Sequence, residues 1–319
     1  MIKIGLYSIS CSGVWFNDRP ALTVEEFIDT AKKFGYTGVE IDLKRPHGSP
    51  LDLNTKRCKE IREYIDKKGL ELPGLAANNC FASVIPEVLE NEMLMVREQI
   101  RVCKDMGAPI LRVFPAWRGV VSKNGIASYD PTRFPEYYGA NIYELEMNIL
   151  ACLKEVTKYA EDAGVVLALQ NHEPIIYNYK DMLAFIKEVN SPYLKACFDA
   201  PCEGWTPERQ SDEYISAATR EVGDLQVFSH ANGEFKELED GRVEMIPYNL
   251  GGNYKQQVVT NYPAFFRTLN ELGWDGYVNF EFCHMPYHNF RPLGYNDYIE
   301  NQLRLAQIYL SRLAESTKE

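Results

Sequence analysis

The stretch EDAGVVLALQNHEP (residues 161–174) holds a helix end, a buried strand and a polar cluster in that order. Gly164 is placed to end a helix in the left-handed conformation. Residues 165–169 are all apolar, which is typical of a strand buried on both faces. The four polar residues QNHE (170–173) then follow. Polar side chains that can bind a metal or form hydrogen bonds therefore stand at the tip of an apolar strand.

The same unit of apolar run, polar loop and amphipathic helical stretch occurs eight times. The apolar runs are 3–9, 38–43, 70–77, 109–114, 165–170, 194–200, 225–231 and 276–282. Apolar strands alternating with helices indicate a parallel sheet covered on both faces. Eight units within 319 residues favour a closed (β/α)8 TIM barrel. An open doubly wound sheet usually carries a Gly-rich phosphate turn after its first strand, and SISCSGVWFNDRP has none. We expect one barrel domain over residues 1–319.

Two of the predicted loops are long, at 115–141 and 231–257. They follow strands, where barrel enzymes build their sites, so they are lids or substrate walls, or they cover an oligomer interface. Aromatic residues are frequent near the predicted rim, and each either contacts sugar or packs under a loop. They are Trp15, Phe16, Trp117, Tyr137, Tyr138, Trp205, Tyr254 and Tyr287.

The composition is that of a soluble globular protein, with 45% hydrophobic residues and a formal charge of −11. Nucleic acid and anionic membrane need a basic surface, so neither is expected as a partner. MIKIGLYSIS lacks the features of a signal peptide, and no apolar run is long enough to span a membrane. Eight cysteines without a CxxC pair predict reduced thiols in a cytoplasmic protein.

Four strand ends carry possible metal ligands: Gln170, Asp199, His230 and Glu281. Barrel closure would bring adjacent strand ends together, and three oxygen donors with one imidazole suit Mn²⁺, Mg²⁺, Co²⁺ or Zn²⁺. Taken singly, Asp199 could be a helix N-cap and His230 a hydrogen-bonded structural residue. Glu281 stands between two phenylalanines, where an ionised carboxylate needs a partner.

Other polar or aromatic residues near the strand ends are candidates for substrate binding. They are Glu40, Asn79, Arg112, Trp117, Glu234 and His284. Arg112, Arg118 and Arg291 could hold a carboxylate or phosphate. Because no glycine nest indicates a phosphate site, a neutral sugar or keto-sugar is expected.

The runs VVLALQNH, KACFDA, LQVFSHANG and GYVNFEF resemble the last four strands of the sugar phosphate isomerase/epimerase family. KIGLYSIS and TGVEID extend the resemblance to the first strands. The family shares the barrel of xylose isomerase and endonuclease IV. The resemblance implies one divalent ion, often Mn²⁺, held by a Glu, an Asp, a His and a second Glu. Asp199, His230 and Glu281 match the last three of these.

The chain departs from the family's motif at two places. The family usually has Glu-Asn-His where this chain has Gln170-Asn171-His172, and many members have a His three residues after the Asp, where this chain has Cys202. The two family glutamates are thought to act as a pair of proton-transfer groups. A glutamine can offer its carbonyl oxygen to a metal but cannot act as a general base.

Glu281 is then the one matching base. Aldose–ketose isomerisation and β-elimination each need one base, whereas epimerisation needs a substitute for the second. Candidates for the substitute are His172, Glu173, Glu234 and His284. His172 lies two residues past Gln170, on the same side of the strand, and its pKa suits acid–base work. Alternatively, His172 forms a hydrogen bond to the substrate or to a metal ligand.

We therefore expect a divalent-metal-dependent sugar isomerase or epimerase, with Glu281 as base. Arg112 and His172 would position the substrate or stabilise its oxyanion. The alternatives are a lyase acting on a keto-sugar or keto-glycoside and a sugar-binding barrel without activity. A phosphodiesterase like endonuclease IV is disfavoured by the negative net charge of the chain and by its small number of histidines, which is five. The expected partners are a small sugar and further copies of the chain, as a homodimer or homotetramer.

Overall fold

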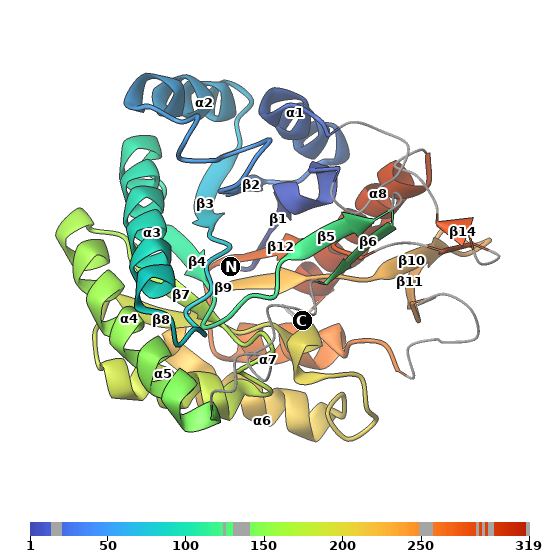
Figure 1. The fold of residues 1–319 in the computed structure, drawn as a ribbon. Helices are drawn as coiled ribbons and strands as arrows, with labels where there is room; N and C mark the ends of the chain where they lie inside the picture. Colours follow the sequence, from blue (N-terminus) through green and yellow to red (C-terminus); the bar gives the residue numbers. More distant parts are fainter. Residues whose placement is uncertain are drawn as a thin grey trace.

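Eight parallel strands form a closed barrel in the computed structural model of this chain (Figure 1). The structure describes all residues except 14–20, 124–125, 130–140, 249–257, 285–286, 289–290, 293–296 and 317–319. The barrel strands are β1 (Lys3–Tyr7), β2 (Gly38–Asp42), β3 (Glu71–Ala76), β4 (Ile110–Val113), β7 (Val166–Gln170), β8 (Leu194–Cys197), β9 (Gln226–Ala231) and β12 (Tyr277–Phe280). The predicted (β/α)8 barrel is confirmed, and each predicted apolar run contains one of these strands.

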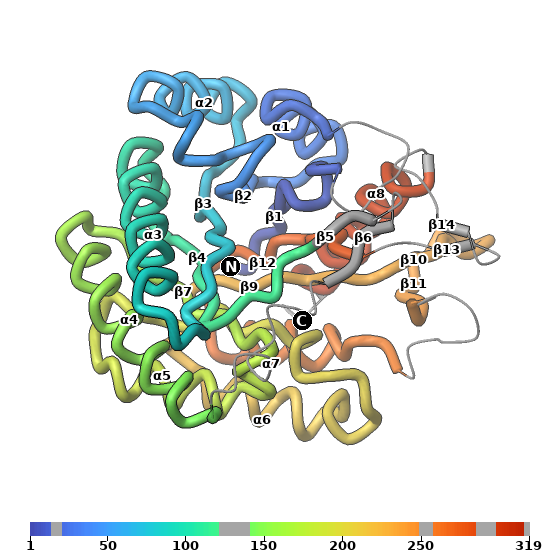
Figure 2. Tube along the Cα trace, viewed as in Figure 1, coloured from blue at the N-terminus to red at the C-terminus, as the bar shows by residue number. Residues whose placement is uncertain are grey.

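The strands are ordered β1-β12-β9-β8-β7-β4-β3-β2 around the barrel, and β2 pairs again with β1. Closure is made by β1, whose Gly5 lies opposite Gly38 on one side and Asn279 on the other. Apart from the six described strands that lie outside the barrel, the order follows the chain, as the colours along the trace in Figure 2 show. The C-terminal ends of the strands therefore meet at one rim.

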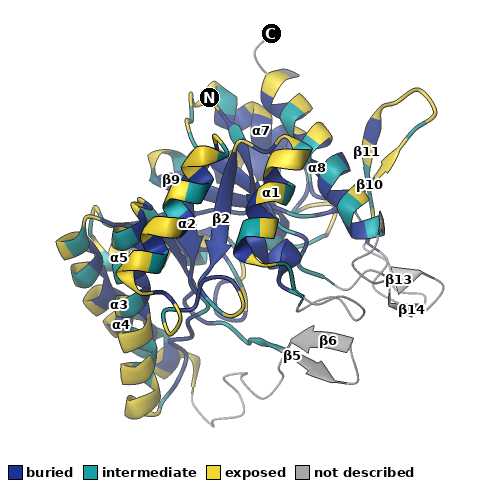
Figure 3. Cartoon of the chain, turned by 90° about the horizontal axis from the view of Figure 1, so that it is seen from above, coloured by how far each residue is buried: buried dark blue, intermediate teal, exposed yellow. Residues whose placement is uncertain are grey.

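Helices surround the barrel and leave their outer faces exposed, while the barrel strands are buried (Figure 3). The helices are α1 (Val24–Phe34), α2 (Thr55–Lys67), α3 (Pro86–Met106), α4 (Ile142–Ala163), α5 (Tyr179–Val189), α6 (Asp212–Val222), α7 (Tyr262–Glu271) and α8 (Asp297–Ser316). Local sequence sets their ends. Thr23 and Glu26 form a capping box at the start of α1. Gly164 ends α4 at φ 71°, as predicted.

Short hairpins and 3-10 helices occupy the connections between these elements. The hairpins are β5 (Val120–Lys123) with β6 (Ile126–Tyr129), β10 (Glu234–Glu237) with β11 (Val243–Ile246), and β13 (Tyr287–His288) with β14 (Arg291–Pro292). The 3-10 helices are η1 (Ser8–Cys11), η4 (Ala200–Glu203) and η5 (Gly223–Leu225). The first two hairpins lie within the predicted long loops, and the second packs on α8, where the rings of Phe235 and Tyr309 are 5.2 Å apart.

The interior of the barrel changes from apolar to polar along the strands. Ala168, Cys197, Phe228 and Tyr277 form an apolar cluster separate from the main core. Because side chains alternate across a strand, the residue two positions later faces the same way. Those residues are Gln170, Asp199, His230 and Asn279. The apolar layer therefore forms the floor beneath a polar layer at the rim.

Among the described residues, none of the helices has both the length and the apolar character needed to cross a membrane.

The side chain of Asn279 fills the space that Gly5 leaves free, so a side chain at position 5 would disturb this packing. A Cβ at position 5 would overlap Asn279 Oδ1 and approach Gly38 O to 3.2 Å. We expect Gly5→Ala to lower the free energy of unfolding by about 1–3 kcal/mol, since added atoms strain a packed interior. Denaturant unfolding measures this. In the double variant Gly5→Ala/Asn279→Ala the overlap is gone, so its cost should be clearly smaller than the sum of the single costs. Additive costs would contradict this packing account.

Candidate active site

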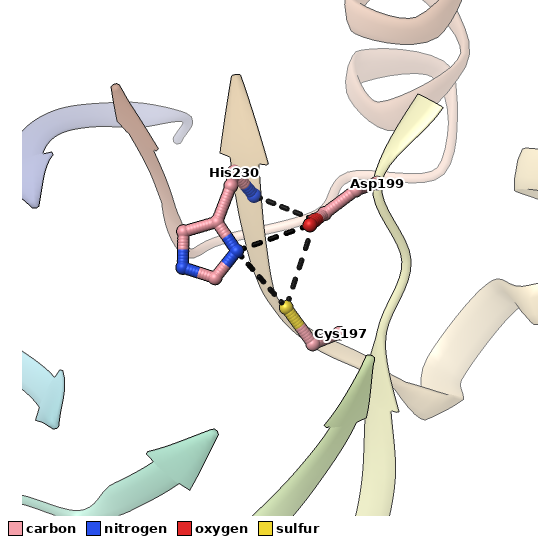
Figure 4. A group of neighbouring side chains, drawn as sticks. All are labelled: Cys197, Asp199 and His230. Atoms are coloured by element: carbon pink, nitrogen blue, oxygen red, sulfur yellow. Dashed lines mark hydrogen bonds and ion pairs between the residues drawn. The ribbon is translucent and has the colours of Figure 1, made fainter. Parts of the chain in front are cut away.

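Three of the four predicted metal ligands come together at the rim. His230 Nδ1 lies 3.0 Å from Asp199 Oδ2, and the amide nitrogen of Gln170 bonds the same carboxylate oxygen. The Gln170 nitrogen is also 3.4 Å from His230 Nδ1. Cys197 joins the group, with its sulfur 3.6 Å from both Asp199 Oδ1 and His230 Nδ1 (Figure 4). The donor atoms of Cys197, Asp199 and His230 all lie within 4.8 Å of one another.

Asp199 occupies the N-cap position of η4 without capping it. β8 ends at Cys197, so Asp199 lies two residues beyond the strand and not at its end as predicted. The carboxylate turns instead into the barrel, where it accepts a 2.6 Å hydrogen bond from the backbone N–H of His230. Asn171 holds the backbone of Asp199, accepting from its N–H at 2.8 Å and donating to its carbonyl at 3.1 Å. The capping explanation for Asp199 therefore does not hold, and Asn171 fixes its position.

His230 is completely buried between two carboxylates. On the side opposite Asp199, its Nε2 lies 2.9 Å from Glu40 Oε2, and Asn279 donates to the same Glu40 oxygen at 2.9 Å. Burial alone lowers the pKa of His230, but Glu40 and Asp199 outweigh it and raise that pKa well above its ordinary value. Each ring nitrogen of His230 therefore faces a carboxylate that can accept a hydrogen bond from it.

A pocket opens above this group. Its lining combines polar groups with aromatic and apolar side chains: Tyr7, Ile9, Lys44, Asn78, Arg112, Phe114, Trp117, Val120, Gln170, His172, Glu281 and Cys283. Asp199, His230 and Glu40 lie beneath the surface of the pocket and are buried. Gln170 and Glu281 therefore connect the buried group with the space that a ligand could enter.

Glu281 follows directly after β12, and its backbone N–H donates to Ala231 O at 2.8 Å. Burial raises the pKa of Glu281 to about 7, with His230 acting in the opposite direction. A carboxylate removed from water resists ionisation unless a positive charge compensates it. Glu281 is therefore poised to exchange a proton near neutral pH or to accept a cation.

Arg112 reaches across the interior from β4 to β1. It donates to Ala77 O and to the Tyr7 hydroxyl, both at 2.8 Å. Its guanidinium lies 4.0 Å from the ring centroid of Phe114, and Trp117 stacks on the same ring at 4.8 Å. Burial by itself lowers the pKa of Arg112, but Tyr7, Glu40 and Asp42 raise it above its ordinary value. Arg112 is a fixed cation in the pocket wall.

His172 projects into the pocket from the loop after β7, with its ring edge-on to Phe114 and Trp117. Its Nδ1 lies 2.6 Å from the carbonyl oxygen of Glu173. Burial lowers the pKa of His172, so the neutral ring donates from Nδ1 and leaves Nε2 as an acceptor. The structure thus brings His172 and Glu281 to the same pocket.

Four predicted substrate-binding residues are placed away from the pocket lining. Glu40 bonds His230 beneath it. Asn79 fastens the end of β4, donating to Phe114 O at 2.7 Å and accepting from Phe114 N at 3.0 Å. Glu234 and His284 pair with each other at 3.0 Å, and Tyr298 donates to Glu234. The substrate-binding role predicted for these residues stays a prediction, because strand-end position alone does not fix where a side chain points. Arg112 and Trp117 do line the pocket.

Several residues of the site were not predicted to act in it: Tyr7, Asn171, Cys197, Asn279, Lys44 and Asn78. Tyr7, Cys197 and Asn279 each end or interrupt an apolar run, but neutral side chains there do not distinguish site from core. Trp15, Phe16, Tyr137, Tyr138 and Tyr254 lie outside the described residues, as do the side chains of Tyr287 and Arg291. Trp205 packs edge-on against Tyr248, and Arg118 lies 3.5 Å from Glu173.

The sequence matches a family model described as the xylose isomerase-like TIM barrel over residues 28–306. This chain belongs to that family. No curated protein matches it in sequence.

Solved structures of named sugar epimerases are similar to this family member over their whole length. L-ribulose 3-epimerase has a TM-score of 0.69 at 16% identity, with 100% of this chain and 96% of that chain covered. D-psicose 3-epimerase from Clostridium cellulolyticum H10 has 0.70 at 16% identity, with 98% and 99% covered. The 3-keto-D-glucoside 4-epimerase YcjR from E. coli has 0.66 at 16%, with 98% and 99% covered. At these identities, the likeness shows the shared fold.

The donor groups of this family member fit a divalent cation. Gln170 Oε1 is buried and has no hydrogen-bond partner, and a half-turn of the amide would exchange it with the nitrogen that now meets Asp199. Glu281 forms no ion pair with a cationic side chain among the described residues, and burial opposes its ionisation. A bound cation would therefore stabilise its charged form. Carboxylate and amide oxygens with one imidazole suit Mn²⁺ and similar ions.

Glu40 should tune metal binding through His230. A histidine that binds metal through Nδ1 donates its Nε2–H to Glu40, and the carboxylate raises the basicity of the ring. We expect Glu40→Gln to weaken Mn²⁺ binding about 10–100-fold, measured from the free Mn²⁺ signal in electron paramagnetic resonance. Glu234→Gln is the matched control, because Glu234 is also buried against a histidine but lies away from His230. Equal affinities in the two variants would refute the role of Glu40.

Proposed function

We propose that this chain is a divalent-metal-dependent sugar isomerase or epimerase that transfers a proton at a carbon next to a carbonyl. The observation that carries the proposal is Glu281, a pocket-lining carboxylate whose pKa is raised to about 7 by burial and is also affected by the charges of His230 and Asp199. The family and the sugar epimerases among the similar structures support the same class of reaction. The substrate in this proposal is a sugar or keto-sugar.

Asp199, His230 and Glu281 would hold the ion, and Gln170 would add its amide oxygen. Mn²⁺ is the proposed ion, with Mg²⁺, Co²⁺ and Zn²⁺ as alternatives. The bound ion would polarise the substrate carbonyl and stabilise negative charge on its oxygen. Metal binding at Nδ1 requires the loss of the proton that this nitrogen shares with Asp199.

Glu281 is the proposed general base. It would take the proton from the carbon next to the carbonyl and return it to the neighbouring carbon in an isomerisation. A base with a pKa near the working pH is efficient because it is both ionised and basic enough. The amide of Gln170 has no such capacity, so it binds without transferring protons.

His172 is the proposed second group of the reaction. Its Nδ1–H is engaged by Glu173 O at 2.6 Å, which leaves Nε2 available to the pocket. As a proton-transfer group it would complete an epimerisation, and as a hydrogen-bonding group it would position the substrate. Arg112 contributes positive charge to the same wall of the pocket.

A lyase is the second candidate, favoured by the glutamine at position 170. Among the described residues that line the pocket, Glu281 is the one carboxylate. β-Elimination from a keto-sugar or keto-glycoside needs one base, which removes the proton next to the carbonyl while the substituent on the following carbon leaves. Release of that substituent distinguishes a lyase from an isomerase.

Removing the base tests the central assignment. We expect Glu281→Gln to lower the rate of deuterium incorporation into the substrate about 10²–10⁴-fold, the usual contribution of a general base. Proton NMR in D₂O with Mn²⁺ and a panel of ketoses, including D-fructose and D-tagatose, measures it. Glu234→Gln, which changes a buried carboxylate outside the pocket, serves as the control. A near-normal rate in Glu281→Gln would show that another residue is the base.

Restoring a carboxylate at position 170 tests the one-base interpretation. We expect Gln170→Glu to introduce or increase two-face epimerisation, because a second base would then stand beside the pocket. Chiral separation of the products from the same ketoses detects it. Gln170→Asn, which keeps an amide but shortens the side chain, should gain no epimerisation. If Gln170→Glu leaves the stereochemical outcome unchanged, the glutamine does not limit the reaction in this way.

A further inference from the structure

Tyr7 ends β1 and lines the pocket while remaining almost wholly buried, with 2% of its surface exposed. Its hydroxyl oxygen accepts a 2.8 Å hydrogen bond from Nη2 of Arg112. The guanidinium is itself fixed by the bond from Nη1 to Ala77 O and by Phe114, whose ring it covers at 4.0 Å. Tyr7 therefore receives a hydrogen bond from a cation that has little freedom to move.

The hydroxyl hydrogen of Tyr7 has no acceptor within the part of the chain that the structure describes. A tyrosine hydroxyl can accept and can donate one hydrogen bond, and here only the accepting side is used. A buried donor left without an acceptor costs free energy. The pocket is the open space beside this side chain, so an oxygen atom of a ligand there would satisfy the donor.

Arg112 also makes Tyr7 a stronger donor. Hydrogen bonds in a chain polarise one another, and a charged donor at the first position strengthens the next bond. In a pocket from which water is excluded, such a fixed donor stabilises developing negative charge without rearranging. Tyr7 and Arg112 together thus have the physical properties of one hydrogen-bond donor in an oxyanion hole.

We propose that the Tyr7 hydroxyl, backed by Arg112, donates a hydrogen bond to the substrate oxygen that becomes negative during proton removal. The inference rests on the proposed function. Glu281 takes the proton from carbon, the pair of electrons of that C–H bond forms the carbon–carbon double bond, and the carbonyl pair moves to the oxygen. Tyr7 keeps its proton throughout. Tyr7 is then a catalytic residue, and Arg112 is a positioning residue that acts through it.

The test compares Tyr7→Phe with Tyr36→Phe. Tyr36 is buried to the same extent, and its hydroxyl donates to Leu303 O at 2.7 Å outside the barrel. Deuterium exchange into D-fructose, D-tagatose and related ketoses is followed by NMR with Mn²⁺ present. We expect kcat to fall about 10²–10³-fold in Tyr7→Phe, as on loss of an oxyanion donor. KM should change little, because the bond strengthens only in the transition state.

Arg112→Lys supplies the coupling measurement. It keeps a positive charge but loses the planar fork that reaches Tyr7 and Ala77. Adding it to Tyr7→Phe should lower kcat by much less than it does alone, because the two residues act as one unit. Thermal unfolding of every variant separates loss of function from loss of fold.

Three outcomes would overturn the inference: equal kcat in the two phenylalanine variants, a raised KM with unchanged kcat in Tyr7→Phe, or additive effects with Arg112→Lys. If the wild-type chain exchanges no proton of any ketose, the proposed function fails instead. The contact is then read by ¹⁹F NMR of 3-fluorotyrosine-labelled protein, with the Tyr7 signal assigned from Tyr7→Phe. A shift of that signal on adding D-tagatose supports the contact, and an unmoved signal refutes it.

Discussion

The pairing of β1 with β12 closes the barrel, and the arrangement at the rim depends on that closure. Glu40 lies on β2 and His230 on β9, 190 residues apart in sequence, yet their side chains meet at 2.9 Å. Between them Asn279 of β12 occupies the space that the missing side chain of Gly5 on β1 leaves free. A small residue in the closing strand thus allows two carboxylates to hold one imidazole.

Buried charge explains why the site takes this form. Asp199, Glu40 and His230 are almost inaccessible to water, where unpaired charges are costly. Each carboxylate is satisfied by His230 and by a neutral amide, Gln170 for Asp199 and Asn279 for Glu40. Within the described part of the chain Glu281 forms no ion pair, and burial raises its pKa to about 7. This difference supports the proposed roles: the paired groups hold the site in place, and Glu281 carries out proton transfer.

The opposite wall is organised around another buried charge. Arg112 is held by Ala77 O, Tyr7 and the Phe114 ring, and His172 stands edge-on to the same aromatic pair. Positive charge, a hydroxyl donor and a neutral imidazole therefore face the space that Glu281 also lines. That combination suits a substrate that gains negative charge on oxygen while it loses a proton from carbon.

The sequence by itself determined the barrel and the residue types at its rim. Eight apolar runs with helix-ending glycines specify strands and helices locally, and period-two alternation places Gln170 and His230 toward the interior. Tertiary structure decided which of these side chains meet. Glu40 and Asn79 end or follow strands as Arg112 does, but only Arg112 reaches the pocket. The reason is that a strand end fixes a position on the rim, whereas the direction of a long polar side chain depends on partners from distant strands. The role proposed for Tyr7 could not be predicted from the sequence for the same reason, since its contact with Arg112 is what distinguishes it from an ordinary core tyrosine.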